Sequence, residues 1–87
     1  MLKLHFKDKR QAPLWLTEER FTIGQAANNQ LVLADSGISA SHAEILREQG
    51  HYFISDCASQ GGTFVNAERI SGRFQLRSGD AIRLGSV

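Results

Sequence analysis

Hydrophobic and polar residues alternate along much of this chain with a period of two, which is typical of β-strands with one buried face. In the segment 2–6, leucine and phenylalanine alternate with lysine and histidine. The segment 43–48 alternates in the same way, and Gln49-Gly50 then turns the chain into the apolar segment 51–55. This order predicts a β-hairpin.

Further short strands are expected wherever a few apolar residues stand between turn residues. They are the segments 14–17, 21–23, 31–33, 63–65, 68–70, 74–76 and 81–84. No stretch of the chain has the apolar spacing of an amphipathic helix. The pattern predicts an all-β protein, an antiparallel β-sandwich of about ten or eleven short strands.

Length and charge narrow the picture further. The chain has 87 residues and a net charge of +1. We expect residues 1–87 to form a single domain, the N-terminal part of a longer protein, with its last strand truncated at Val87. Like charges form no block, so neither a nucleic-acid partner nor a membrane surface is expected. The sequence has no apolar leader and no apolar run long enough to span a bilayer, which favours a cytoplasmic protein.

The sulfur and imidazole groups point to no metal site. Cys57 is the only cysteine, which favours a reducing compartment and a small buried side chain. The spacing of His5, His42, His51 and Cys57 matches no zinc signature, so no metal and no cofactor are expected.

A catalytic interpretation has to be weighed against a binding one. Ser39 or Ser41, His42 and Asp56 stand in the order of a Ser-His-Asp triad, which would make the protein a small hydrolase. The chain has no Gly-x-Ser-x-Gly elbow and no predicted helix to carry one. A histidine beside a loop is more often a structural donor and acceptor, so we expect a protein that is not an enzyme.

Five short motifs appear in a fixed order. They are Gly24-Gln25, Asn29-Gln30-Leu31-Val32-Leu33, Ser39-Ala40-Ser41-His42, the segment from Asp56 to Asn66, and Gly79-Asp80-Ala81-Ile82-Arg83-Leu84-Gly85. In this order and spacing they resemble the forkhead-associated (FHA) domain, a β-sandwich that recognises phosphothreonine in partner proteins. The resemblance covers nearly the whole chain.

The resemblance implies a set of site residues. Its phosphopeptide-binding positions fall on Ser39, Gln25, Ala40, Gln60 and Gly61, with Ser39 matching the serine that contacts phosphate. Its loop-supporting positions fall on Gly24, His42, Gly62, Thr63 and Asn66. The implied function is protein–protein interaction in signalling, with a partner phosphorylated on threonine.

Three positions depart from the family pattern, and all three face the ligand in that pattern. Gln25 replaces an arginine, Ala40 replaces an arginine or polar residue, and Gly61 replaces an asparagine. Two versions therefore stay open: a domain that binds phosphothreonine, and a degenerate domain that binds a partner without phosphate. A third interpretation is an oligomerisation module that uses an open sheet edge.

Overall fold

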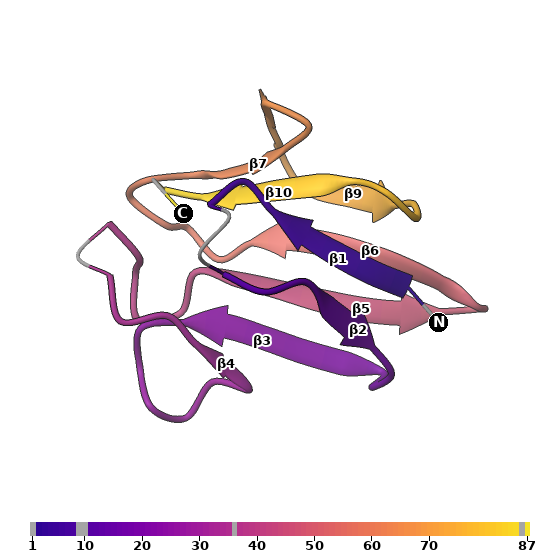
Figure 1. Cartoon of the computed structure of the whole chain (residues 1–87), viewed down its shortest axis with the longest axis horizontal. Helices are drawn as coiled ribbons and strands as arrows, with labels where there is room; N and C mark the ends of the chain where they lie inside the picture. The colour runs from indigo at the N-terminus through magenta and orange to yellow at the C-terminus, as the bar shows by residue number, and fades with distance from the viewer. Residues whose placement is uncertain (1, 9–10, 36, 86) are drawn as a thin grey trace.

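The computed structural model describes residues 2–8, 11–35, 37–85 and 87, and these residues form ten β-strands (Figure 1). The strands make two five-stranded sheets. The predicted β-sandwich is thus confirmed. Within its described residues, the chain has no helix that could cross a bilayer.

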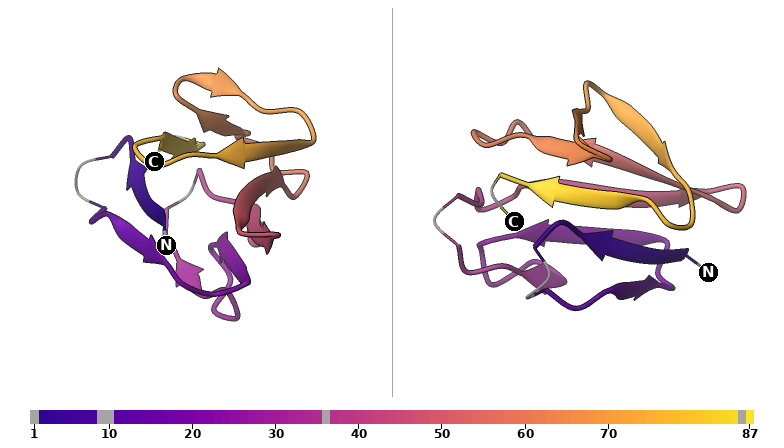
Figure 2. Two further views of the ribbon diagram at one scale, coloured as in Figure 1. Left: turned by 90° about the vertical axis from the view of Figure 1, so that its right-hand side faces the viewer. Right: turned by 45° about the horizontal axis from the view of Figure 1, so that its top comes forward.

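The first sheet contains both ends of the chain. In spatial order it consists of β2 (Leu14–Leu16), β1 (Leu2–Phe6), β10 (Ala81–Leu84), β7 (Thr63–Val65) and β8 (Glu68–Arg69). The second sheet consists of β4 (Leu31–Val32), β3 (Arg20–Gly24), β5 (Ala43–Glu48), β6 (His51–Asp56) and β9 (Arg73–Leu76). Figure 2 shows the molecule from two further directions.

Most neighbouring strands are antiparallel, as the sequence predicted, but each sheet also contains one parallel pair. These pairs are β1 with β10 and β3 with β4. The alternation of apolar residues could not predict this, because it reports which face of a strand is buried and not the direction of its neighbour.

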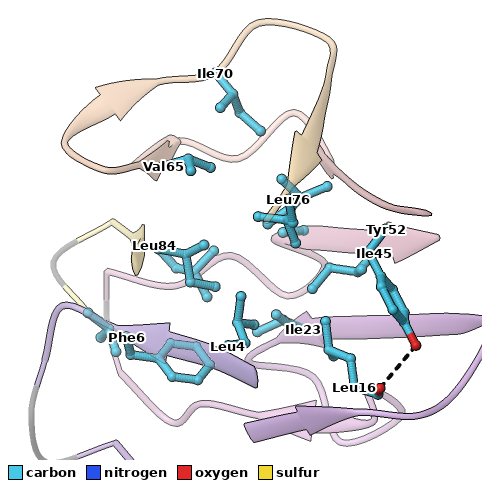
Figure 3. Close-up of a cluster of buried hydrophobic side chains, with 14 of the residues drawn as sticks. Leu4, Phe6, Leu16, Ile23, Ile45, Tyr52, Val65, Ile70, Leu76 and Leu84 are labelled. Atoms are coloured by element: carbon cyan, nitrogen blue, oxygen red, sulfur yellow. Dashed lines mark hydrogen bonds between the residues drawn. The ribbon is translucent and has the colours of Figure 1, made fainter. Parts of the chain in front are cut away.

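The core lies between the two sheets and is built from the alternating residues. In β1 the buried side chains are Leu2, Leu4 and Phe6, and the two between them are half-buried. Figure 3 shows side chains of both sheets meeting, with Leu4 from one and Ile45 from the other. Burying a leucine or isoleucine side chain contributes about 1.5–3 kcal/mol, so this core supplies most of the attraction between the layers.

Tyr52 adds a polar link between the layers. Its ring is buried, and its hydroxyl donates a hydrogen bond of 3.0 Å to the carbonyl oxygen of Leu16 (Figure 3). Tyr52 lies on β6 and Leu16 on β2, so this bond joins the two sheets.

Strand direction gathers several loops at one end of the sandwich. β3 ends at Gly24, β6 ends at Asp56, and β10 ends at Leu84, all toward the left in Figure 1. The β5–β6 turn lies at the opposite end. The residues that the sequence singled out as a candidate site are mainly on the loops of the left-hand end.

Candidate functional site

Two loops form a shallow hollow at the end of the sandwich. Gly37, Ile38 and Ser39 come from the loop before β5, and Gln60 and Gly61 come from the loop before β7. Three of these five residues, Ser39, Gln60 and Gly61, are among the predicted phosphopeptide-binding positions. The tertiary structure therefore brings together residues that are 21 positions apart, such as Ser39 and Gln60.

Gly24 lets the loop after β3 approach the loop before β5. The amide of Gln25 donates to the carbonyl of Ser39 at 2.9 Å, and the amide of Ala26 donates to the carbonyl of Ala40 at 3.2 Å. A β-carbon on Gly24 would lie only 2.2 Å from the Ala40 oxygen. Gly24 is needed for space rather than for an unusual φ, since it is not among the described glycines with positive φ.

The side chain of Gln25 points to a neighbouring loop. Its Nε2 donates a 3.0 Å hydrogen bond to the carbonyl of Asp35, while the residue itself is exposed. The backbone of Gln25 is thus close in space to that of Ser39, but its side chain brings no positive charge to the hollow.

His42 joins the loops from inside. It is completely buried, and its Nδ1 accepts a 3.1 Å hydrogen bond from the amide of Ser39. Its Nε2 lies 2.8 Å from the carbonyl oxygen of Gly62. Because Nδ1 accepts from an N–H and Nε2 faces a carbonyl, the ring is the neutral tautomer with its proton on Nε2. One side chain therefore fixes both walls of the hollow.

A carboxylate orders the loop that carries Gln60 and Gly61. Asp56 accepts hydrogen bonds from the hydroxyls of Ser59 and Thr63, the latter at 2.7 Å. It also accepts a 3.0 Å bond from the amide of Ser59, whose Oγ in turn accepts a 3.0 Å bond from the amide of Gly62. The resemblance assigned loop support to Thr63, and its fully buried hydroxyl makes that kind of contact.

These bonds also set the acidity of Asp56. Burial raises the pKa of its carboxyl group, but the hydrogen bonds from Ser59 and Thr63 lower it by more. The net pKa lies below the ordinary value of 3.8. The carboxylate form is thus the one that the folded loop prefers.

Ser39 and Gln60 face each other across the hollow. The amide of Gln60 donates to Oγ of Ser39 at 3.3 Å. Because that oxygen accepts here, its own hydrogen points elsewhere, and among the described residues it donates to no protein group. A serine hydroxyl with a free hydrogen on an open hollow can bind an anion.

Three glycines pack closely at this hollow, two of them in its lining. A β-carbon on Gly61 would lie 2.9 Å from Cα of Gly85 and 3.1 Å from the carbonyl oxygen of Gly37. A β-carbon on Gly85 would lie 2.3 Å from the same oxygen. The absence of a side chain at position 61 therefore has a packing reason in this chain. The sequence pattern carried no signal for the role of Gly37.

Gln25 and Ala40 were predicted to bind the phosphopeptide, but neither lines the hollow. Ala40 is exposed and does not line it. Asn66 lies at the far end of β7, where its Nδ2 donates to Asp80 at 2.9 Å and its Oδ1 accepts from the amide of Ala81 at 3.0 Å. Asn66 therefore links the β7–β8 turn to the β9–β10 turn and supports a different pair of loops.

The catalytic alternative does not fit this geometry. Both ring nitrogens of His42 are occupied by backbone groups, so the ring cannot act as a base toward Ser39 or Ser41 without breaking those bonds. Asp56 bonds to Ser59 and Thr63 and makes no hydrogen bond to the imidazole. The described residues also contain no cluster of side chains suited to a metal ion.

The expectation of a buried Cys57 was wrong, because the residue is exposed on the loop that follows β6. Partial desolvation, followed by the charges of Glu44 and Asp56, raises the pKa of its thiol above the ordinary 9.0. The thiolate is therefore disfavoured.

Comparison with known proteins decides the family. The family model of the FHA domain matches residues 21–85. The chain belongs to the FHA domain family. The match includes the whole loop cluster from Gly24 to Gly62, and it excludes only the first strands and the end of the chain.

Individual FHA proteins agree with this assignment. FhaB of Mycobacterium tuberculosis is 27% identical over 76 residues, which is 87% of this chain and 49% of FhaB. The transcriptional regulatory protein EmbR of the same organism is 37% identical over 71% of this chain and 16% of its own length. The chain thus spans at most about half the length of these relatives.

Two solved structures share the fold over most of the domain. EmbR in complex with a low-affinity phosphopeptide superposes with a TM-score of 0.83 at 32% identity, covering 94% of this chain and 21% of that one. An FHA domain studied for its phosphothreonine-dependent interactions gives a TM-score of 0.81 at 33% identity, covering 94% and 84%.

The buried position of His42 leads to a first prediction. His42→Ala leaves the Ser39 amide without its partner, removes one of the two donors to the Gly62 carbonyl, and opens a cavity at a fully buried position. An unpaired buried group alone costs about 1–3 kcal/mol, and the cavity adds to that loss. We expect urea denaturation to show a loss of at least about 2 kcal/mol in the free energy of unfolding. The matched control is His51→Ala, at an exposed position, where a change within about 0.5 kcal/mol is expected. Equal losses in the two variants would contradict this role of His42.

The lowered pKa of Asp56 leads to a second prediction. In the unfolded chain Asp56 binds a proton near pH 3.8, whereas in the folded chain it binds one only at a lower pH. Ionised Asp56 therefore stabilises the folded state above pH 3.8, and this stabilisation is lost as the pH falls through the folded pKa. Urea unfolding at a series of pH values from 5 downward should show this loss. In Asp56→Asn the unfolding free energy should fall less steeply with acidification. In the control Glu18→Gln, at an exposed position, the unfolding free energy should fall with acidification as steeply as in the unmodified domain. An equally steep fall in Asp56→Asn would refute the role of Asp56.

Proposed function

We propose that this FHA domain recognises phosphothreonine in a partner protein, and that the phosphate binds in the hollow between Ser39 and Gln60. The observation that carries the proposal is the Ser39 hydroxyl, whose oxygen is held by the Gln60 amide and whose hydrogen is free to donate. The loops that carry both residues are fixed through His42, so the site is formed before a ligand arrives.

Preformed loops favour binding. Ordering a flexible loop during association costs free energy, and a loop already held by hydrogen bonds avoids that cost. The bonds of Asp56 to Ser59 and Thr63 hold the Gln60 loop in the same manner. The similarity to a structure of EmbR in complex with a low-affinity phosphopeptide supports a phosphopeptide as the ligand.

Gln25 is the main reason to expect modest affinity. Phosphothreonine carries about −1.5 to −2 charges at neutral pH, and a hydrogen bond to a charged group contributes about 1.5–3 kcal/mol. An arginine at position 25 would add such a bond, whereas Gln25 is neutral and its amide is already bonded to Asp35. The lost contact lowers affinity about ten- to a hundredfold.

The same observation supports a second candidate function. If the site is too weak for phosphate, the domain binds its partner without phosphorylation, through the same loops or an open sheet edge. In both versions the domain acts by binding and not by catalysis, since the imidazole of His42 is engaged in holding the loops.

Substitution of the central serine tests the phosphate site. Ser39→Ala removes the free hydroxyl and should weaken phosphothreonine peptides by about tenfold, the value of one hydrogen bond to a charged group. Fluorescence anisotropy with a phosphothreonine peptide library and matched threonine peptides measures the effect. The control Ser41→Ala alters an exposed hydroxyl that does not line the hollow and should leave binding unchanged. If no phosphopeptide binds better than its threonine counterpart, the phosphate-independent version replaces this one.

Restoring a cation tests the role of position 25. Gln25→Arg keeps a donor for the Asp35 carbonyl and adds a charge, so phosphopeptide affinity should rise by about tenfold. Gly61→Asn is a poor companion, because a β-carbon there would meet Gly85 and Gly37. Unchanged affinity in Gln25→Arg, with an unchanged unfolding free energy, would show that position 25 does not face the ligand.

A further inference from the structure

The outer face of the first sheet carries positive charge that nothing in the described protein neutralises. Its outward strand residues include Lys3, Arg83 and Arg69, and Lys7 directly follows β1 on the same side. The single acidic residue in these five strands is Glu68, which pairs with the buried Val65 and so belongs to the inward register.

Strand register brings three of these cations into one row. Phe6 pairs with Ile82 in the parallel β1–β10 ladder, and the amide of Lys7 donates to Ile82 at 2.9 Å, so Lys7 lies beside Arg83. Arg83 pairs with Phe64, and Phe64 pairs with Arg69. We call Lys7, Arg83 and Arg69, together with Phe64, the cationic row. With strands about 4.8 Å apart, the row is about 14 Å long.

Without a bound partner, the cationic row destabilises the folded protein. Like charges on directly neighbouring strand positions destabilise a sheet, and Lys7 and Arg83 are such neighbours. Among the described residues, none of the three cations forms an ion pair. The guanidinium of Arg83 instead lies 3.8 Å from the centre of the Phe64 ring and donates to the Gly85 carbonyl.

The opposite sheet shows the contrast. On its outer face Arg20 pairs with Glu44 and Arg73 with Glu48, both at 2.6 Å. Arg20 and Arg73 are therefore balanced within the protein, whereas the cations of the cationic row form no ion pair among the described residues.

Two acids close to the row along the chain, Asp8 and Asp80, have other interactions. Asp80 accepts hydrogen bonds from Asn66 and from the amide of Arg77. Asp8 has an interaction of its own and lines a separate hollow with Leu33 and Val87. Neither carboxylate lines the groove described next.

A groove adjoins the row at Lys7 and Arg83, while Arg69 and Phe64 do not line it. Lys7 and Arg83 line it together with His5, and small residues at Ala81, Gly79 and Ala67 leave it open. The lining contains three basic side chains and no acidic one.

The row is continuous with the candidate phosphate site. A β-carbon on Gly62 would lie 3.0 Å from Nε of Arg69, so the guanidinium of Arg69 lies against the loop that carries Gln60 and Gly61. Arg83 bonds to Gly85, whose amide donates to Gly62 at 2.9 Å. A peptide held at Ser39 can therefore reach the row within a few residues of extended chain, at about 3.3 Å per residue.

We propose that the cationic row binds a cluster of aspartate and glutamate residues in the same partner, a few residues from the phosphothreonine. The inference rests on the proposed phosphothreonine function and adds a second determinant to it. An acidic peptide fits better than a nucleic acid, because the protein has a net charge of only +1 and the row can neutralise only a few charges. The two contacts lie on one chain of the partner, so the second binds at a high effective concentration.

The test uses phosphothreonine and threonine peptides, each with four aspartates or four asparagines as a flank. The flank begins three residues before the phosphothreonine in one series and three residues after it in the other. On the unmodified domain, the aspartate flank should raise phosphopeptide affinity about three- to tenfold in at least one series, as expected for two or three exposed ion pairs. The gain should shrink as salt is raised.

Variants separate the row from the phosphate site. Lys7→Gln combined with Arg69→Gln should abolish the gain from aspartate while binding of the asparagine-flanked phosphopeptide stays the same. The matched control, Arg20→Gln combined with Arg73→Gln, removes the same charge from the other sheet and should keep the gain. A missing gain in both series, a gain that survives the row variant, or an equal loss in the control would overturn the proposal.

The remaining outcomes are also distinct. If the asparagine-flanked phosphopeptide binds no better than its threonine form, the phosphothreonine function fails. The row is then still tested with the unphosphorylated threonine peptides, by comparing aspartate flanks with asparagine flanks on the same variants. If a thymidine oligonucleotide of equal charge displaces the aspartate-flanked peptide equally well, the row is a general polyanion surface and its assignment to an acidic peptide is wrong.

Discussion

The loop end of this domain depends on one buried imidazole. His42 accepts a hydrogen bond from the Ser39 amide and donates one to the Gly62 carbonyl, and its own backbone bonds to Ile23 and Cys57. These contacts join the end of β3, the loop before β5 and the loop before β7. Since both ring nitrogens are bonded to backbone groups, the histidine is a structural element of the loops.

The hollow is shaped by residues that have little or no side chain. Gly24 admits the Ala40 carbonyl, and Gly61 and Gly85 pack against the Gly37 carbonyl. The close packing of these glycines helps to explain one of the departures from the FHA pattern. Gln25 is an exposed side chain that bonds to the Asp35 carbonyl, so its neutral amide removes a charge without a packing reason. Gly61, in contrast, is required by the close approach of Gly37 and Gly85. The two departures therefore have different physical origins.

Much of the fold could be predicted from the sequence, because a half-buried strand leaves a period of two that is readable residue by residue. The segments 2–6 and 43–48 were found in this way, and the order of short motifs identified the FHA family. The parallel pairing of β1 with β10 could not be found, since it joins opposite ends of the chain. The expectation that Cys57 is buried was wrong because it rested on the usual burial of cysteine, whereas the burial of this residue depends on where its loop lies in the folded protein. Within the site, Ser39 and Gln60 were placed together as the resemblance implied, while Asn66 joins other turns.

The sequence by itself determined the strands, the turn glycines and the family, because these depend on local spacing and on motifs within short segments. It could not show the cationic row, because Lys7, Arg69 and Arg83 are far apart in a chain with a net charge of +1 and no block of like charges. Only strand pairing sets these residues side by side, and only the folded structure shows that they lack ion pairs among the described residues while Arg20 and Arg73 of the other sheet have them. Electrostatic interactions depend on distance in space and not on distance along the chain, so the tertiary structure decided the character of this surface.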